Sequence, residues 1–289
     1  MKELVVLSGK GGTGKTSIVG SFAAIAGNEV LADCDVDAAD LHLLLQPHPQ
    51  QENEFWSGQV AITDEEKCNQ CGLCQYLCRF NAIKDNTIDT IFCEGCGFCS
   101  RICPADAITM KENLAGKWTV SDTRYGPLVH AKLGIAQENS GKLVATVRQQ
   151  ARELAAKMKL DIIISDGPPG TGCPVISSLS GTSLALLVTE PTLSAIHDLE
   201  RVLGVCSHFG VQPLVCVNKA DINEENTIQI ENYCDDQGIE KTMRIPFDNV
   251  FTEAIVRGLP TIEYAKNGIA VLLENLWKQV LKYLSEKGD

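Results

Sequence analysis

The sequence of 289 residues contains no long hydrophobic run and no excess of basic residues. None of its apolar stretches approaches the ~20 residues that a membrane-spanning helix needs, so we expect no membrane anchor. Its 37 acidic residues outnumber its 25 basic ones, which gives a formal net charge of −12. Because nucleic acids and anionic membranes attract basic surfaces, we expect the protein to bind neither. The start of the chain, Met1 to Leu7, is too short for the apolar core of a secretory signal, which favours a cytoplasmic protein.

Cysteine, in contrast, is abundant, with thirteen residues in the chain. Eight of them form two runs with the same spacing, Cys-x2-Cys-x2-Cys-x3-Cys. The runs are Cys68, Cys71, Cys74 and Cys78, followed by Cys93, Cys96, Cys99 and Cys103. Such compact runs are typical of thiolate ligands in a reducing compartment and not of a disulfide scaffold. The other five cysteines are scattered, and we expect them to be small apolar residues.

The spacing of the two runs is that of bacterial two-cluster ferredoxins, in which the fourth cysteine of each run binds the other cluster. This rule predicts two [4Fe–4S] clusters. The ligands are Cys68, Cys71, Cys74 and Cys103 for one cluster, and Cys78, Cys93, Cys96 and Cys99 for the other. Two zinc sites are the alternative, because thiolates also bind zinc, but the doubled spacing favours iron–sulfur clusters. The second run ends in Cys103-Pro104, whereas Arg79 takes the place of the usual proline after the first.

A glycine-rich loop follows a short apolar strand predicted at residues 3–7 and precedes a helix predicted at 15–26. Its sequence is Gly9-Lys10-Gly11-Gly12-Thr13-Gly14-Lys15-Thr16. This is a phosphate-binding pattern, in which glycines let backbone N–H groups turn toward the phosphates. Lys15 is expected to reach the β- and γ-phosphates, and the Thr16 hydroxyl to bind Mg²⁺. Ser17, the next residue, is included in the predicted nucleotide site.

Strands and helices alternate through the rest of the chain. Further strands are predicted at residues 29–33, 160–166, 183–189 and 211–217, and helices at 142–158 and 269–285. This alternation predicts an α/β fold with a mostly parallel sheet covered on both faces. The cysteine-rich segment, residues 62–112, interrupts it and is predicted to be an inserted, small α+β two-cluster ferredoxin domain. Residues 1–61 and 113–289 would then be the two parts of one nucleotide-binding domain. Residues 46–57, which include Pro47 and Pro49, are predicted to be a linker.

Lys10 is a second lysine that an ordinary phosphate loop does not need. With it, the loop resembles the deviant phosphate loop of the MinD/ParA superfamily of P-loop ATPases, which includes the nitrogenase iron protein and iron–sulfur cluster carriers. In that class the first lysine crosses a dimer interface to the partner's phosphates. The resemblance implies catalytic roles for Lys10 and Lys15, ATP as the nucleotide, and a homodimer or a heterodimer with a paralogous ATPase. Some members with an inserted ferredoxin domain are labelled cobyrinic acid a,c-diamide synthase-like.

Two acidic positions also fit this class. Asp33-x-Asp35 resembles its first switch, in which Asp35 would orient or deprotonate the attacking water and Asp33 would be structural. Asp166 ends an apolar strand, as does the carboxylate that holds Mg²⁺ through water. The segment 167–171 after it resembles the second switch, which senses the γ-phosphate.

Base recognition is implied for a third region. Asn218 closes an apolar strand and by resemblance would bind adenine, with Pro246 stacking nearby. The pattern Asn218-Lys219-x-Asp221 also resembles guanine-binding loops, so GTP is the alternative nucleotide.

Together these features predict an ATPase in which a nucleotide-switched dimer gates electron transfer through two clusters to a partner protein. The alternative is an ATP-dependent factor that assembles, carries or scaffolds a metal cluster. Complete sets of four cysteines favour electron transfer, because closed sites hold clusters tightly.

Overall fold

The computed structural model describes residues 1–239, 243–266 and 268–286. The chain divides into two compact units, each built from more than one segment. The first, which we call the sheet unit, comprises Met1–Glu52, Trp118–Ala131 and Gly141–Asp289. The second, which we call the cysteine unit, comprises Asn53–Lys117 and Lys132–Ser140. The predicted domain boundaries after residues 61 and 112 fall inside two long strands that belong partly to each unit.

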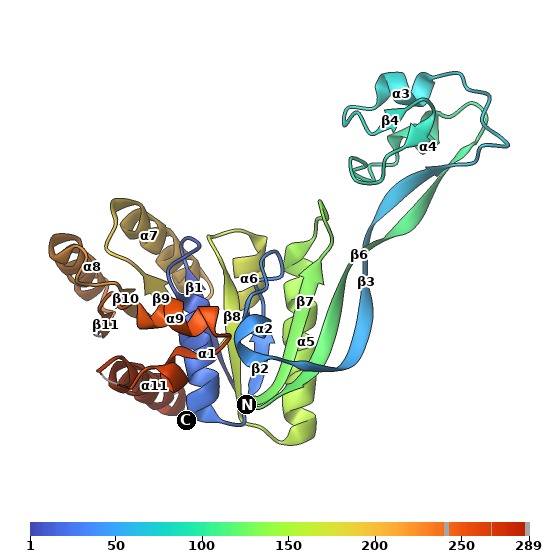
Figure 1. The fold of residues 1–289 in the computed structure, drawn as a ribbon. Helices are drawn as coiled ribbons and strands as arrows, with labels where there is room; N and C mark the ends of the chain where they lie inside the picture. Colours follow the sequence, from blue (N-terminus) through green and yellow to red (C-terminus); the bar gives the residue numbers. More distant parts are fainter. Residues whose placement is uncertain (240–242, 267, 287–289) are drawn as a thin grey trace. The chain divides into compact units, whose positions relative to one another are not determined.

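Within the described residues, nine strands form one sheet in the order β11-β10-β9-β1-β8-β2-β7-β6-β3 (Figure 1). The strands are β1 (Lys2–Ser8), β2 (Val30–Asp33), β3 (His48–Thr63), β6 (Ile108–Thr123), β7 (Gly126–Leu133), β8 (Ile162–Pro169), β9 (Leu184–Thr189), β10 (Gln212–Asn218) and β11 (Met243–Ile245). β1 pairs in parallel with β8 and β9, β2 with β7 and β8, and β10 with β9 and β11. The predicted α/β fold with a mostly parallel sheet is therefore confirmed.

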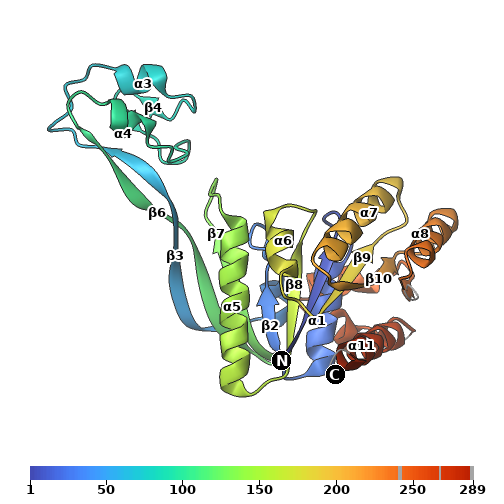
Figure 2. The same ribbon diagram turned by 180° about the vertical axis from the view of Figure 1, so that it is seen from behind.

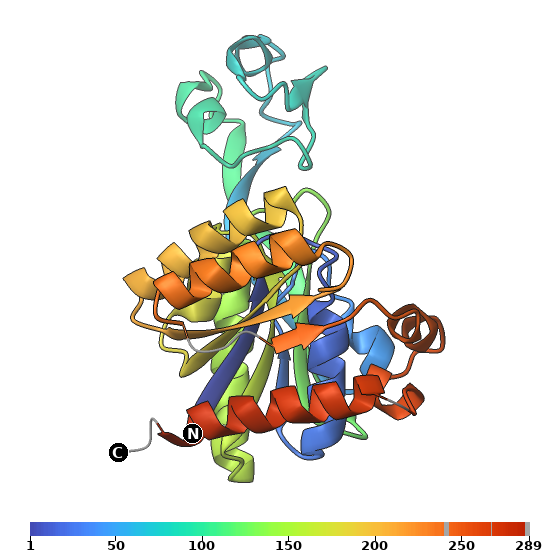
Figure 3. The same cartoon turned by 90° about the vertical axis from the view of Figure 1, so that its left-hand side faces the viewer.

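Helices cover both faces of this sheet. They are α1 (Lys15–Ala26), α2 (Leu41–Leu45), α5 (Ser140–Met158), α6 (Cys173–Leu179), α7 (Leu193–His208), α8 (Glu224–Asp236), α9 (Val250–Val256), α10 (Thr261–Tyr264) and α11 (Gly268–Glu286). Leu4 and Val6 of β1 pack in one core with α1, α2 and α11. Val5 and Leu7 pack in the other core with α6, α7 and α8. The views from behind and from the side show helices on both faces of the sheet (Figures 2 and 3). Successive residues thus face opposite cores, which explains why residues 4–7 of β1 are continuously apolar.

The C-terminal helix α11 packs against α1, as its apolar stripe predicts. The rings of Trp277 and Phe22 lie 4.9 Å apart between centroids, and Leu273 and Leu276 are buried. No helix in the described part of the chain is long and apolar enough to cross a membrane.

The prediction of a linker at residues 46–57 is wrong, because most of that segment belongs to β3. Pro49 lies in this strand although proline lacks the N–H that a sheet interior requires. β3 is the last strand in the sheet order, so it has a neighbour on one side only. An edge strand tolerates proline where the missing donor would face outward.

The cysteine unit holds two short helices, α3 (Leu73–Leu77) and α4 (Phe98–Ile102), and an antiparallel pair, β4 (Ile83–Lys84) and β5 (Thr87–Ile88). Its halves repeat with an offset of 25 residues, as Cys68 and Cys93 show (93 − 68 = 25). The conformation repeats as well, since Gly72 and Gly97 precede the two helices with φ of 72° and 70°. Equivalent backbone turns therefore present the two cysteine runs.

A buried ion pair links β1 to α5. Glu3 and Arg148 are each 4% exposed, and Arg148 Nε and Nη2 donate to the Glu3 carboxylate at 2.6 and 2.8 Å. Arg152 Nη2 donates to the same carboxylate at 2.8 Å. Arg148 also donates to the carbonyl groups of Ser177 and Ser180, in and just after α6. One guanidinium therefore joins a central strand to two helices.

We expect Arg148→Met to lower the free energy of unfolding of the sheet unit by about 3 kcal/mol, because it leaves a buried carboxylate and two carbonyl groups short of partners. Guanidinium unfolding followed by circular dichroism measures this. Arg244→Met is the matched control, because Arg244 also pairs with two glutamates, Glu224 and Glu231, but at the surface. It should change stability little. Equal stability of the two variants would contradict a structural role for the buried pair.

Candidate nucleotide and iron–sulfur sites

The phosphate loop, Gly9 to Thr16, joins the buried end of β1 to the start of α1. Gly12 and Gly14 have φ of 80° and 95°, a conformation that favours glycine. A Cβ on Gly9 would lie 2.3 Å from the Asp198 Cβ, and one on Gly14 would lie 2.5 Å from the Asn218 Nδ2. Because neither position has room for a side chain, the loop stays closely packed against its neighbours.

Lys15 is buried at the start of α1, close to the carboxyl ends of β2 and β8. Asp33 and Asp166 are paired in the register of these two strands. Burial raises the pKa of Asp166 to about 6, although the charge of Lys15 and a hydrogen bond from Thr16 oppose this shift. Burial and the neighbouring Asp166 raise the pKa of Asp33 well above its usual range. Lys15, Thr16 and Asp166 thus converge, as the predicted nucleotide site requires.

Two buried oxygens of this region have no hydrogen-bond partner in the part of the chain that the structure describes. They are Oδ1 of Asp166 and the hydroxyl of Thr13. Buried polar atoms usually have partners, so such atoms indicate a missing ligand or water. Carboxylate and hydroxyl oxygens beside a phosphate loop are suited to Mg²⁺ and a nucleotide, so the residues present fit both groups.

The two aspartates of the predicted first switch have different surroundings. The Asp33 side chain accepts the backbone N–H groups of Asp35 and Leu41, at 3.2 and 3.3 Å. The Asp35 carboxyl is half-buried, and burial raises its pKa against the opposing charge of Lys15. Asp33 is therefore fixed by the backbone, whereas Asp35 lies near the phosphate-binding lysine.

Lys10 turns back onto its own chain. Its Nζ lies 2.7 Å from Oε1 of Glu190, the residue after β9, and 3.1 Å from the Thr192 hydroxyl. Glu190 also pairs with Lys219, at 3.0 Å. Burial alone would raise the pKa of Glu190, but hydrogen bonds from both lysines hold it below its usual value. The sequence interpretation missed Glu190, although its place directly after an apolar strand could have indicated it.

The predicted base-recognition residues lie beside the phosphate loop. The buried Asn218 side chain donates from Nδ2 to the Thr13 carbonyl at 2.8 Å. Lys219 Nζ donates to the Gly12 carbonyl at 3.2 Å. Pro246 is half-buried and directly follows β11. The next residue, Phe247, donates its N–H to the Asp221 carboxylate at 2.6 Å. Asn218 and Lys219 thus brace the loop, which the sequence interpretation did not foresee.

The predicted second switch packs closely against β1. A Cβ on Gly167 would lie 2.4 Å from Cδ2 of Leu7, so glycine is needed there. Gly170 donates its N–H to the Ser8 carbonyl at 2.9 Å. The second switch is therefore joined to the strand that carries the phosphate loop.

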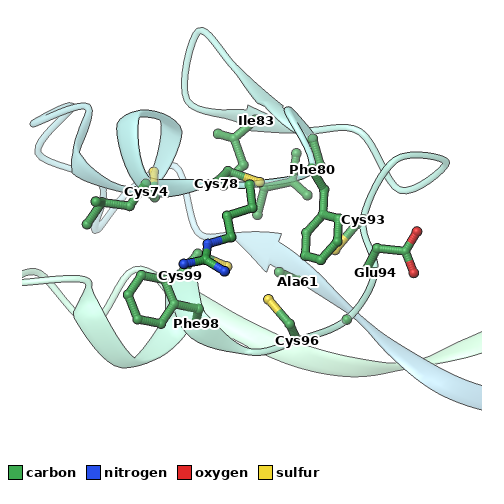
Figure 4. Close-up of a pocket in the computed structure, with 15 residues that line it drawn as sticks. Ala61, Cys74, Cys78, Phe80, Ile83, Cys93, Glu94, Cys96, Phe98 and Cys99 are labelled. Atoms are coloured by element: carbon green, nitrogen blue, oxygen red, sulfur yellow. The ribbon is translucent and has the colours of Figure 1, made fainter.

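Four cysteines, together with Cys74, line one of the cavities in the cysteine unit. They are Cys78, Cys93, Cys96 and Cys99, and we call this space of about 490 Å³ the second-run cavity (Figure 4). Its other lining is largely apolar, and Phe80 and Phe98 remain 44% and 49% exposed. Three of these thiols come from the second run, and two, Cys74 and Cys78, come from the first.

Another cavity of the cysteine unit, which we call the first-run cavity, is lined by Cys74 and by the three run cysteines that the second-run cavity lacks. Its cysteines are Cys68, Cys71, Cys74 and Cys103. Its volume is only about 10 Å³, so the lining residues close around it. Three thiols come from the first run and one from the second, the same crossing in reverse.

The thiols surround these cavities and do not meet at one point. In the described residues, no three histidine, cysteine, aspartate or glutamate side chains are placed to hold a single metal ion. Burial raises the pKa of Cys74 and of Cys99, and the nearby thiols Cys68 and Cys93 add to the respective shifts. The four thiols predicted for each cluster line one cavity together, and such a donor set fits a multi-iron cluster.

Comparison with known proteins extends this description. The model of the CobQ/CobB/MinD/ParA nucleotide binding domain matches residues 4–262. The chain belongs to this family. The fold agrees, because MinD of Pyrococcus horikoshii OT3, solved with Mg-ADP, superposes with a TM-score of 0.57 at 20% identity, over 96% of this chain and 95% of that one. The prediction of a MinD/ParA-type P-loop ATPase is thus confirmed at the level of family and fold.

Two relatives are similar to large parts of this chain. The uncharacterized protein MJ0578 of Methanocaldococcus jannaschii is 35% identical over 227 residues, which are 78% of this chain and 80% of that protein. The iron-sulfur cluster carrier protein of Pyrococcus abyssi is 26% identical over 163 residues, which are 50% of this chain and 55% of the carrier.

We expect Asp166→Asn to have opposite effects on stability and on nucleotide binding. An aspartate titrates near pH ~3.9 in an unfolded chain, so the raised pKa favours folding below about pH 4, and this contribution is lost as pH rises through about 6. The nucleotide-free variant should therefore unfold at a higher temperature than wild type at about pH 8, with no gain at about pH 4. Titration with a fluorescent ATP analogue should show at least about tenfold weaker binding with Mg²⁺.

Asp161→Asn is the control for this experiment, because Asp161 is exposed. Destabilisation by Asp166→Asn at the higher pH would show that the ionised carboxylate is stabilised in the folded protein, contrary to our assignment.

Proposed function

We propose that the protein is an ATP-binding and ATP-hydrolysing iron–sulfur protein in which a nucleotide-switched dimer gates electron transfer through two [4Fe–4S] clusters to a partner protein. The observation that carries this proposal is the crossing of the cysteine runs. The first-run cavity combines three thiols of the first run with Cys103. The second-run cavity combines three thiols of the second run with Cys78, and with Cys74, which lines both cavities. This is the ligand exchange that the two-cluster ferredoxin spacing requires.

The eight run cysteines would hold the two clusters, which when bound supply one-electron carriers. The chain's own contribution is the surroundings. The lining of the second-run cavity is largely apolar, and Phe80 and Phe98 beside its thiols are exposed at the surface. A partner protein therefore has an apolar surface to contact beside one set of thiols.

In the nucleotide site the residues have separate roles. Lys15 binds the phosphates, and Thr16 and Asp166 provide oxygens to Mg²⁺. In this proposal Asp35 orients the attacking water and accepts its proton, because its raised pKa makes it a better base than an ordinary aspartate. Asn218, which donates to the Thr13 carbonyl of the loop, reads the base.

The switch in this proposal is Lys10. Within one chain it is paired with Glu190, so reaching a partner's phosphates requires that this ion pair open. The γ-phosphate of ATP offers more negative charge than a single carboxylate, which favours the exchange. The partner is a second copy or a paralogous ATPase.

A second candidate function is the ATP-dependent assembly or delivery of a cluster. It is favoured by the similarity to the iron-sulfur cluster carrier protein of Pyrococcus abyssi, which covers about half of this chain. In that case the clusters are cargo, and ATP should change how tightly the thiols hold them.

Iron release distinguishes the two functions. We expect protein purified without oxygen to contain about eight irons per chain. With Mg-ATP and an iron chelator, gated electron transfer predicts that iron is retained while the cluster absorption or its reduction changes. Carriage predicts the loss of about four irons only when ATP is present. Lys15→Ala is the control, because it should abolish any response to ATP.

Fewer than about six irons at the start would rule out two [4Fe–4S] clusters in the chain.

The dimer is tested through Lys10→Ala. With a non-hydrolysable ATP analogue, wild type should change from monomer to dimer by light scattering, whereas the variant should bind the analogue within about threefold of wild type but remain monomeric. Lys278→Ala, which removes an exposed lysine from α11, should dimerise normally. A full dimer of Lys10→Ala would exclude the proposed crossing of the interface.

A further inference from the structure

The repeat allows the two cysteine cavities to be compared position by position. Ile108 lines the first-run cavity, and its equivalent Ile83 lines the second-run cavity (83 + 25 = 108). Thr63 lines the first-run cavity, and its equivalent Ile88 lines the second-run cavity (63 + 25 = 88). One position therefore keeps its side chain, whereas the other changes from a hydroxyl to an alkyl group.

The hydroxyl of Thr63 is buried, and it has no hydrogen-bond partner within the ranges that the structure describes. Thr63 is the last residue of β3, and the next residue already bonds elsewhere, since the Asp64 N–H donates to the Ala107 carbonyl at 2.7 Å. A hydroxyl buried without a partner costs roughly 1–3 kcal/mol, so such groups normally have an acceptor. The acceptors expected in the first-run cavity are the sulfur atoms of a cluster bound by its four cysteines.

Charged lining residues do not distinguish the cavities in the same way. Arg79 and Glu94 line the second-run cavity, so their charges offset each other. Their equivalents Pro104 (79 + 25 = 104) and Asn69 (94 − 25 = 69) line the first-run cavity and are neutral. The side chains other than cysteine thus add no net charge to either site. Asn69 and Asn86 also bring polar groups to the first-run cavity, but of these three lining residues Thr63 is the one whose side-chain polar atom is buried without a partner among the described residues.

We propose that the Thr63 hydroxyl donates a hydrogen bond to a sulfur of the cluster held in the first-run cavity, and that this cluster has the higher reduction potential of the two. The proposal rests on the proposed function. Reduction adds one electron, and so one negative charge, to a site, without transfer of the hydroxyl proton. A donor beside the sulfur stabilises that added charge, whereas the alkyl group of Ile88 does not. An electron that enters the cysteine unit therefore occupies the cluster in the first-run cavity.

The test uses the complete protein loaded with iron and sulfide. Thr63→Val keeps the branched shape and removes the hydroxyl. Titration with dithionite, followed by electron paramagnetic resonance, should give two one-electron steps. We expect the variant to shift only the higher step, making reduction about tenfold less favourable, which is ~59 mV lower for one electron.

The reciprocal variant tests the same idea at the other site. Ile88→Thr places a hydroxyl at the equivalent position, and we expect it to raise the lower step by a similar factor. Thr109→Val is the matched control, because Thr109 is exposed on β6 and lines neither cavity, so neither step should move.

Unchanged potentials in a fully loaded Thr63→Val protein would overturn the inference and leave the proposed function intact. A shift of the lower step would overturn the assigned order of the two sites. If Thr63→Val does not retain iron, an unchanged potential in loaded Ile88→Thr overturns the inference instead. Wild-type protein without about eight irons would overturn the proposed function, and the inference with it.

Discussion

The buried ion pair of Glu3 and Arg148 determines how three elements of the nucleotide site are held. Glu3 lies in β1, whose end becomes the phosphate loop, and Arg148 lies in α5. The same guanidinium bonds the Ser177 and Ser180 carbonyls, in and after the helix that follows the second switch. Because a charge buried without its partner is costly, these elements cannot separate by small independent movements. A change in the second switch must therefore either preserve this network or move α5 as a unit.

The parallel sheet adds a second constraint, since its strands end at one edge. Ser8, Asp33 and Asn218 are the last residues of their strands, Asp166 lies three residues before the end of β8, and the four come from separate parts of the sequence. The fold thus brings together a phosphate loop, two carboxylates and the Asn218 amide without any local sequence signal joining them. The same edge also places Glu190 after β9, where it meets the two lysines.

Local signals predicted the parts of this protein that local chemistry decides. The apolar residues 3–7, the glycines of the loop and the apolar stripe of the last helix each correspond to an element of the structure. The cysteine spacing predicted an exchange of the fourth thiols, and the cavities show Cys78 and Cys103 grouped in that way. The binding of clusters there is still a prediction.

The sequence could not indicate contacts between distant residues. Pro49 suggested a linker because proline disrupts sheets. The free-energy cost of a proline, however, depends on whether its strand has a neighbour on both sides. Glu3 was read as part of an apolar strand, and its partner lies 145 positions away. Glu190 acquires its role only through Lys10 and Lys219, which follow the strands β1 and β10 on either side of β9.

The two halves of the cysteine repeat have become unequal in one further respect. Gly95 and its equivalent Gln70 (70 + 25 = 95) share a positive φ, but a Cβ on Gly95 would lie 2.1 Å from the Gln59 carbonyl oxygen. The first half accepts a side chain at this turn, and the second half does not. Substitutions at this turn are therefore tolerated in the first half, whereas contact with β3 requires glycine in the second.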